Sequence, residues 1–167
     1  IILVLPEQHI NHWNELVKKH PFHITHRVIE GGETRFHSVK NGIDAIEEEE
    51  VLVAIHDGVR ALIDKYTIGK SFEVAQEKGN AVVSIGLKDS IRSISPNGNQ
   101  QEDRSKFRLI QTPQTFKLSL IRDAFQQGFD PLFTDDASVL EKAGHDIHLI
   151  EGSYQNIKIT TPDDLLI

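Results

Sequence analysis

Apolar runs and helically spaced apolar positions alternate along this chain. Ile1–Leu5 is apolar at every position, which is typical of a strand buried on both faces. The residues that follow place apolar side chains on one helix face, at Ile10, Trp13, Leu16 and Val17. A second short strand is expected at His26–Glu30, and Gly31-Gly32 ends it.

The same alternation continues to the end of the chain. Further strands are predicted at Val51–Ile55, Ala81–Leu87, Ile147–Glu151 and Asn156–Ile159. Helices are predicted around the stripe Val39, Ile43 and Ile46, at Thr67–Lys78, Leu118–Gln127 and Thr134–Ala143, and from Thr161 onward. Strands that alternate with helices predict an α/β domain with a mostly parallel sheet. In such sheets ligands bind at the carboxyl ends of the strands.

One polar stretch, Ser93–Gln101, departs from this pattern. It contains the turn signal Pro96-Asn97-Gly98, and its flanks Ile91–Ile94 and Lys106–Leu109 resemble strands. The segment is too polar to pack in a core of its own. We therefore expect a β-hairpin arm here.

Composition and charge narrow the functional classes. Of the 167 residues, 38% are hydrophobic and 26% are charged, as in an ordinary soluble globular protein. No apolar run reaches the ~18 residues that a membrane helix needs. The net charge of −7 argues against non-specific binding to nucleic acid, and the lack of cysteine excludes disulfides and fits a cytoplasmic protein. Because the chain opens at Ile1 within an apolar run and has no Met, we expect the natural protein to start upstream.

Three groups of residues on or directly after predicted strands are candidates for a functional site. Asp57 follows Val51–Ile55, where a carboxylate can hold Mg²⁺ together with substrate phosphates, and Arg60 lies three residues on. An Asp57-Gly58 turn explains the same residues about equally well. Asn156 and Lys158 share a face of the last predicted strand. The alternative interpretation is an edge strand whose polar side chains are simply solvated.

The third group is the turn at Gly31-Gly32 with Arg35 and Ser38. Backbone N–H groups at a strand-to-helix turn favour anions, although an ordinary tight turn with a helix cap is the better reading of these residues alone. The evenly spaced His20, His23 and His26 predict no metal site, because no fixed geometry follows from their spacing.

Several longer motifs are similar, in order along the whole chain, to those of the 2-C-methyl-D-erythritol 4-phosphate cytidylyltransferase family. They are Gly31-Gly32-Glu33-Thr34-Arg35 with Ser38-Val39 and Asn41-Gly42; His56-Asp57-Gly58-Val59-Arg60; Lys88-Asp89-Ser90-Ile91; Asp103-Arg104; Gln111-Thr112-Pro113-Gln114-Thr115-Phe116; Thr134-Asp135-Asp136-Ala137-Ser138; and Gly152-Ser153 with Asn156-Ile157-Lys158-Ile159-Thr160-Thr161-Pro162-Asp163-Asp164-Leu165. The ordered set is far more specific than any one motif.

The resemblance implies an activity and a role for each matched residue. The activity is transfer of CMP from CTP to 2-C-methyl-D-erythritol 4-phosphate with release of pyrophosphate, in the non-mevalonate isoprenoid pathway. The catalytic residues would be Lys158, Asp57 and Arg60. The nucleotide would be bound by Gly32, Glu33, Ser38, Asp57 and Gly58. The acceptor would be bound by Arg60, Ser90, Arg104, Thr112 and Thr134. The cofactor would be Mg²⁺, with Asp57 as its ligand and Asn156 as a second candidate.

The resemblance also implies an architecture. The expected fold is a single three-layer α/β/α Rossmann-like nucleotidyltransferase domain over residues 1–167, with a dimerisation arm at approximately 91–108. In the family the arm crosses to a partner subunit, so a homodimer is implied and Ser90 and Arg104 would act in trans. The family's Gly-rich triphosphate loop has no counterpart here, and we expect it to precede Ile1.

Two alternatives remain at this point. A ribitol 5-phosphate cytidylyltransferase would share the fold and the chemistry, and Val59 before Arg60 favours it slightly, whereas Asp103-Arg104 and the motif from Thr134 favour the first reading. A dimeric nucleotide-binding remnant without catalysis is the alternative of another class.

Overall fold

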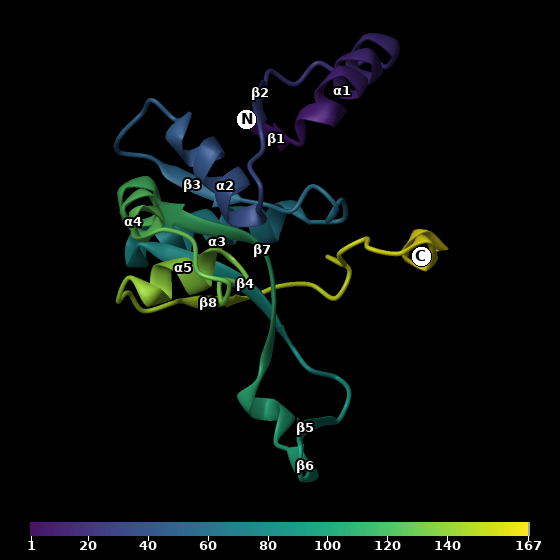
Figure 1. The fold of residues 1–167 in the computed structure, drawn as a ribbon, viewed down its shortest axis with the longest axis vertical. Helices are drawn as coiled ribbons and strands as arrows, with labels where there is room; N and C mark the ends of the chain where they lie inside the picture. Colours follow the sequence, from purple (N-terminus) through teal and green to yellow (C-terminus); the bar gives the residue numbers. More distant parts are fainter. Residues whose placement is uncertain (167) are drawn as a thin grey trace. The chain divides into compact units, whose positions relative to one another are not determined.

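The computed structural model (Figure 1) describes residues 1–166. They group into two compact units. Unit 1 consists of Ile1–Val51 and Lys117–Asp146, and unit 2 consists of Leu52–Phe116 and residues 147–166. Each unit combines helices with paired strands, so the predicted α/β class is confirmed.

Unit 1 begins with a parallel strand pair joined by a helix. The strands β1 (Ile2–Leu5) and β2 (Arg27–Glu30) pair with Ile2 opposite Arg27 and Leu5 opposite Glu30. The connecting helix α1 (Glu7–Lys19) carries the predicted apolar stripe, but none of its residues is fully buried. This crossover leaves the carboxyl ends of both strands on one side, where Gly31 and Gly32 follow β2.

The buried core of unit 1 lies among three further helices. They are α2 (Arg35–Asp44), α4 (Leu118–Ala124) and α5 (Asp136–Lys142). A 3₁₀ helix, Phe125–Gln127, continues α4, and Gly128 ends it at a φ of 84°. The apolar side chains buried here are Phe36, Ile43, Leu118, Ile121, Ala124, Phe125, Ala137, Val139 and Leu140.

Unit 2 is built on a four-stranded sheet in the order β3-β7-β4-β8. The strands are β3 (Leu52–Ile55), β7 (Arg108–Lys117), β4 (Asn80–Gly86) and β8 (Leu149–Glu151). β4 runs parallel to β8 and antiparallel to β7. The mostly parallel sheet stays a prediction for the chain as a whole, and the antiparallel β7 was not foreseen.

The centre of this sheet is β4, which packs against α3 (Lys65–Lys78). Ala81, Val82 and Val83 have no exposed surface, and Ala81 and Val83 pack in one cluster with Ala75 of α3 and Ile150 of β8. Asp64 caps the start of α3 by accepting hydrogen bonds from Thr67, and Gly79 ends the helix as predicted.

The strand β7 is longer than the strand-like flank Lys106–Leu109 suggested. Val82 pairs with Gln114 and Ser84 pairs with Ile110, so β7 carries extra residues opposite Val83. This bulge tolerates Pro113, which cannot donate to a regular ladder. The sequence pattern did not predict this strand, because the buried half of β7 is mostly polar and contains Pro113.

The polar stretch between β4 and β7 forms the expected hairpin. β5 (Ile91–Ser95) and β6 (Gly98–Glu102) pair antiparallel, and Ser95 lies opposite Gly98 across the turn. Gly98 adopts a φ of 129°, which favours glycine. Figure 1 shows this pair as a separate two-stranded ribbon that leaves the main sheet of unit 2. The arm's part in dimerisation stays a prediction.

Two predicted elements near the chain end differ from the structure. Asn156–Ile159 is not a strand, although its backbone is held by the loop after β3. The final helix is a 3₁₀ helix at Pro162–Leu166, where Asp164 accepts from the N–H groups of Thr160 and Thr161. Among residues 1–166 no helix is long and apolar enough to cross a membrane.

Candidate active site

A charged cluster of Asp57, Arg60 and Lys158 lies beyond the carboxyl end of β3. The Asp57 carboxylate oxygen Oδ2 is 3.4 Å from Arg60 Nε and 3.2 Å from Lys158 Nζ. Asp57 and Arg60 expose only 14% and 11% of their side chains, whereas Lys158 exposes 46%. Two cations on one carboxylate leave an excess positive charge in a chain of net charge −7, which favours binding of phosphate.

The backbone holds this cluster together. Arg60 N–H donates to the Asp57 carbonyl at 3.0 Å, and Ile159 N–H donates to the Val59 carbonyl at 3.0 Å. The second bond ties the segment that carries Lys158 to the loop that carries Asp57. These two segments are far apart in the sequence, and the hydrogen bond between them keeps Lys158 beside the Asp57 carboxylate.

Asn156 supports the cluster from inside the protein. Its side chain is fully buried and donates to the Thr112 carbonyl at 2.8 Å and to Gln111 Oε1 at 3.3 Å. Its backbone carbonyl accepts from Arg60 Nη1 at 2.8 Å. The prediction that Asn156 and Lys158 share one face is wrong, because Lys158 is half-exposed while Asn156 is enclosed.

Thr112 anchors the Asp57 loop to β7. Its hydroxyl accepts from the Asp57 N–H at 3.0 Å and lies 3.0 Å from His56 Nδ1. His56 Nε2 lies 3.1 Å from the Arg60 carbonyl, which can only accept, so the proton of a neutral His56 is assigned to Nε2. Thr112 then donates to Nδ1, and a continuous chain of hydrogen bonds fixes both ends of the loop.

The predicted metal ligands fit a magnesium ion to different degrees. Asp57 offers one partly exposed carboxylate, and Mg²⁺ commonly binds through one or two carboxylates plus substrate phosphates. Asn156 Oδ1 is a buried acceptor without a hydrogen-bond donor within the described chain, but it is enclosed. Residues 1–166 contain no cluster of three or more His, Cys, Asp or Glu suited to a metal. Of the two predicted ligands, only Asp57 has a partly exposed side chain, whereas that of Asn156 is fully buried.

Unit 1 contains the turn of Gly32, Glu33 and Ser38. Ser38 Oγ accepts from the Gly32 N–H at 3.0 Å and can donate to the Thr34 carbonyl at 3.0 Å. A Cβ on Gly32 would lie 2.4 Å from the Cβ of His37, so only glycine fits there. Glu33 is exposed at the tip of this turn, which Ser38 braces from within.

Thr134 lies elsewhere in unit 1. It is exposed and directly precedes Asp135, which caps α5 by accepting from the Ser138 N–H at 2.8 Å. The predicted helix therefore begins two residues later than expected, at Asp136.

The remaining predicted residues lie at the base of the hairpin in unit 2. Ser90 is exposed in the link between β4 and β5, and Arg104 donates to the Lys88 carbonyl in the same link. Hydrogen bonds from Ser105 hold the pKa of Asp103 below its usual value, so a carboxylate borders Arg104. No described contact joins Ser90 or Arg104 to the charged cluster of the same chain.

Sequence reasoning missed several supporting residues. Tyr154 donates to the Gly86 carbonyl at 2.8 Å, and Lys88 Nζ lies 3.6 Å from the centre of its ring. His56 and Gln111 bond to the segments around Asp57 and Asn156. All of these positions fall inside or beside the motifs, but only the fold shows what they contact.

Comparison with known proteins gives one consistent result. The family model of 2-C-methyl-D-erythritol 4-phosphate cytidylyltransferase matches residues 1–167. A 2-C-methyl-D-erythritol 4-phosphate cytidylyltransferase of Bacteroides thetaiotaomicron is 43% identical over 167 residues, which is 100% of this chain and 76% of that relative. One of Porphyromonas gingivalis is 45% identical over 166 residues, covering 99% and 74%.

Solved structures agree with the sequence relatives. A 4-diphosphocytidyl-2C-methyl-D-erythritol synthase from Anaerococcus prevotii superposes with a TM-score of 0.87 at 26% identity, covering 99% of this chain and 75% of that one. A 2-C-methyl-D-erythritol 4-phosphate cytidylyltransferase from Thermus thermophilus gives 0.82 at 29% identity, covering 99% and 77%. Sequence and structure therefore point to the same family.

Proposed function

Because the chain belongs to the 2-C-methyl-D-erythritol 4-phosphate cytidylyltransferase family, we propose that its charged cluster carries the family's chemistry. The protein is a nucleotidyltransferase that moves CMP from CTP to 2-C-methyl-D-erythritol 4-phosphate and releases pyrophosphate, a step of isoprenoid biosynthesis. The observation that carries the proposal for the site is the pair of cations, Arg60 and Lys158, on the single carboxylate of Asp57.

The reaction requires positioning and neutralisation of charge. A phosphate oxygen of the acceptor attacks the α-phosphorus of CTP and forms a new P–O bond. The bond from that phosphorus to the oxygen bridging to the β-phosphorus breaks, and pyrophosphate leaves with that oxygen. No covalent enzyme intermediate is needed, so fixed cations suit this step.

The two cations have different freedom. Arg60 is nearly buried and is held by both Asp57 and the Asn156 carbonyl, so it presents a fixed charge. Lys158 is half-exposed and pairs with Asp57 at 3.2 Å at the end of a flexible side chain, so it can turn from Asp57 to a phosphate oxygen as charge develops. We assign Lys158 to the α-phosphate, Arg60 to the acceptor phosphate, and Thr112 to holding Asp57.

The other roles rest on the family motifs. We propose that Gly32, Glu33 and Ser38 contact the cytosine or the ribose, with Gly58 beside the nucleotide. The braced turn around Gly32 supports this assignment, because it presents backbone groups in a fixed shape. Thr134 is proposed to contact the acceptor, and its exposure leaves its hydroxyl accessible.

We propose Mg²⁺ as the cofactor, with Asp57 as its protein ligand. When bound, the ion supplies positive charge that neutralises the triphosphate and the departing pyrophosphate. Asp57→Asn should raise the Mg²⁺ concentration for half-maximal activity by about tenfold or more and should lower kcat, because the amide lacks the charge that holds the ion.

The control for this variant is Asp64→Asn, which makes the same change at the cap of α3. It should leave the Mg²⁺ dependence unchanged, since Asn also caps helices well. Asp57→Asn protein that is folded by circular dichroism and keeps the wild-type Mg²⁺ dependence would remove Asp57 from the metal site. Protein that unfolds without a separable kinetic defect would favour the turn reading of Asp57.

A homodimer formed through the hairpin arm is also proposed. Ile94 and Phe107 are large apolar residues that expose 87% and 43% of their surfaces. Apolar side chains exposed together in this way are typical of a surface that contacts a partner. Pairing of two arms across a two-fold axis would cover them. Arg104 would then face the acceptor in the partner's site, where its planar fork suits phosphate oxygens.

The direct test is pyrophosphate release from CTP by the protein expressed from its complete gene. Release should require 2-C-methyl-D-erythritol 4-phosphate, and kcat/KM should exceed that for ribitol 5-phosphate by at least about tenfold. A preference for ribitol 5-phosphate would reassign the acceptor. Tight CTP binding without release with either acceptor would support the remnant reading.

A further inference from the structure

A bidentate ion pair joins two distant segments of unit 1. Arg35 donates from Nη1 and Nη2 to the two carboxylate oxygens of Asp136, at 2.8 and 2.7 Å. The Asp136 side chain is 1% exposed and that of Arg35 38% exposed. Arg35 opens α2 and Asp136 opens α5, 101 residues later in the chain. A buried carboxylate with a geometrically matched partner fixes both position and orientation.

An aromatic stack reinforces the same junction. Phe36, the neighbour of Arg35, stacks on Phe125 at 4.6 Å between ring centroids and lies parallel to Phe133 at 5.7 Å. Phe133 immediately precedes Thr134, and Asp136 follows it by two residues. Residues on both sides of Thr134 are therefore held by two consecutive residues of α2.

The same helix start also holds the turn of Gly32, Glu33 and Ser38. Thr34 caps α2 and lies next to Arg35, and Ser38 bonds to the backbone of both Gly32 and Thr34. This turn is thus braced by its own hydrogen bonds. Thr134, in contrast, lies in the connection between Gly128 and α5, where the described contacts to α2 are made by other residues, namely Phe129, Phe133 and, at the start of α5, Asp136.

We propose that Arg35 and Asp136 form a positioning pair, which sets Thr134 relative to the nucleotide-binding turn. The proposal rests on the proposed function, because it takes Thr134 as an acceptor contact and the Gly32 turn as a nucleotide contact. The ion pair links the places where the two substrates are recognised in unit 1. A positional error of even 1 Å in a substrate contact can be costly for the reaction.

Because the turn is self-braced, loss of the pair displaces the Thr134 segment rather than the turn. Arg35→Lys keeps the positive charge but loses the two-point contact. It should raise KM for 2-C-methyl-D-erythritol 4-phosphate by about tenfold, while KM for CTP changes by less than about threefold. Asp136→Asn keeps the shape of the side chain and should give the same split between the two KM values.

A matched control exists at the other end of α2. Arg122 on α4 donates from Nη2 to the carbonyls of Ile46 and Ile43, at 2.7 and 3.4 Å. Arg122→Lys breaks a similar tie between helices of the same unit but touches neither the turn nor Thr134. It should lower the melting temperature without changing either KM.

The decisive measurement is a double-mutant cycle with Thr134→Val. If Arg35 acts through Thr134, the effect of Arg35→Lys on the acceptor KM should largely disappear in the Thr134→Val background. Additive effects, or equal rises in both KM values, would overturn the positioning pair while the wild-type protein remains active. A wild-type protein that does not turn over CTP with this acceptor would overturn the proposed function as well.

Should Arg35→Lys fail to fold, Asp136→Asn carries the same cycle. Thermal unfolding of each variant separates a loss of stability from a change in binding. An acceptor KM that follows the melting temperature across all variants, including Arg122→Lys, would reduce the pair to a structural contact and contradict the proposal.

Discussion

Two antiparallel strand pairs in unit 2, β4–β7 and β5–β6, are stabilised by different kinds of contact. In β4 and β7 most residues are buried, including the polar side chains of Gln111, Thr112, Gln114 and Thr115. In β5 and β6 only the end residues Ile91 and Glu102 are even partly buried. The first pair is held by packing on both faces and the second by its own ladder.

The interior of the β4–β7 pair is a polar framework. Thr115 Oγ1 donates to Ser71 at 2.9 Å, Gln111 donates to the Ser153 carbonyl at 2.9 Å, and Thr112 carries the Asp57 loop. Breaking one bond of a buried network leaves other groups unsatisfied, so the network resists displacement. The charged cluster therefore rests on a preorganised base.

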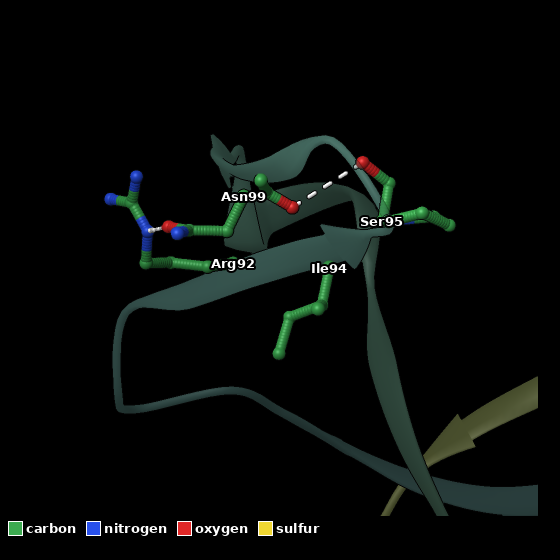
Figure 2. A pocket seen from close by; sticks show the side chains of 6 residues that line it. Arg92, Ile94, Ser95 and Asn99 are labelled. Carbon is green, nitrogen blue, oxygen red and sulfur yellow. Dashed lines mark hydrogen bonds between the residues drawn. The ribbon is translucent and has the colours of Figure 1, made fainter.

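The hairpin has only local ties. Figure 2 shows Arg92 and Asn99 directed toward each other across the strands, while Ile94 points away from them. Ser95 Oγ donates to the Gly98 carbonyl at 3.3 Å at the turn. A lone hairpin of this kind is marginal in water, so its stability in the protein is expected to come from a partner. The comparison thus supports the two proposals that the β4–β7 pair carries the catalytic cluster and that the hairpin carries the dimer contact.

The largest effect is expected from Lys158→Ala, in the charged cluster whose Asp57 loop is held by Thr112 of β7. The variant should lower kcat by about 10²-fold or more, because the positive charge that we propose for the α-phosphate is lost. Steady-state kinetics with CTP and the acceptor measures it. Its stability should stay near that of the wild type, since Lys158 is half-exposed.

Lys70→Ala is the matched control for that variant. Lys70 has the same exposed fraction of 46% and pairs with Glu73 at 3.1 Å, but it lies on α3. Its kcat should equal that of the wild type. An unchanged kcat in Lys158→Ala would remove the lysine from the reaction, and an equal loss in both variants would show a general electrostatic effect.

The next test removes the exposed pair. Deletion of Ser93–Gln101 should shift the protein from dimer to monomer in sedimentation velocity, because the proposed contact surface is lost. Unit 2 should keep its fold, since the deleted residues contribute almost nothing to the core. A deletion variant that remains dimeric would place the interface elsewhere and would contradict the proposal that the hairpin carries the dimer contact.

A mixing experiment sharpens the same point. Chains with Arg104→Ala and chains with Lys158→Ala should each be weak, but a heterodimer would keep one intact site if Arg104 acts in the partner's site. Equal mixing then restores about a quarter of the wild-type activity. A mixture no more active than its parents, with subunit exchange verified by mass spectrometry, would show that Arg104 acts in its own chain or not at all.

Sequence reasoning reached the elements that follow a regular pattern. The strand before Asp57 and the hairpin turn at Pro96-Asn97-Gly98 were both expected, although β3 is only partly buried. Periodicity and turn residues carry such information locally.

Other features depend on contacts that no local pattern encodes. The buried part of β7 was not predicted, because a polar Gln111 and a Pro113 are unusual in a core strand. The bulge that accommodates them arises only when β7 pairs with β4. Asn156 was placed on an exposed strand face because alternation was assumed for a segment that has no ladder. Arg35 and Asp136 meet across 101 residues, which no local pattern encodes.

The smallest expected effect compares carboxylates at the two strand pairs. Asp64 caps the helix that covers β4, and Asp64→Ala should lower the free energy of unfolding by about 1 kcal/mol, because a backbone N–H loses its acceptor. Glu102 accepts from Gln100 at the open end of the hairpin, and Glu102→Ala should lower the free energy of unfolding by less than Asp64→Ala does. Urea unfolding at neutral pH measures both.

The pH dependence of the same two variants completes the test. The Thr67 backbone N–H, followed by its hydroxyl, holds the pKa of Asp64 below its ordinary value of 3.8, and hydrogen bonds from Ser93 and then Gln100 lower that of Glu102. A lowered pKa in the folded state means that the stabilisation is present above the ordinary value and is lost as the pH falls through the lowered one. The stability difference between wild type and Asp64→Ala should therefore begin to shrink below about pH 4 and should reach its minimum once the pH is below the lowered pKa, where the folded wild type has also lost the charged cap. A difference that persists unchanged into acid would show that the charge of Asp64 contributes nothing, and a Glu102 effect as large as that of Asp64 would show that the hairpin is built into the core after all.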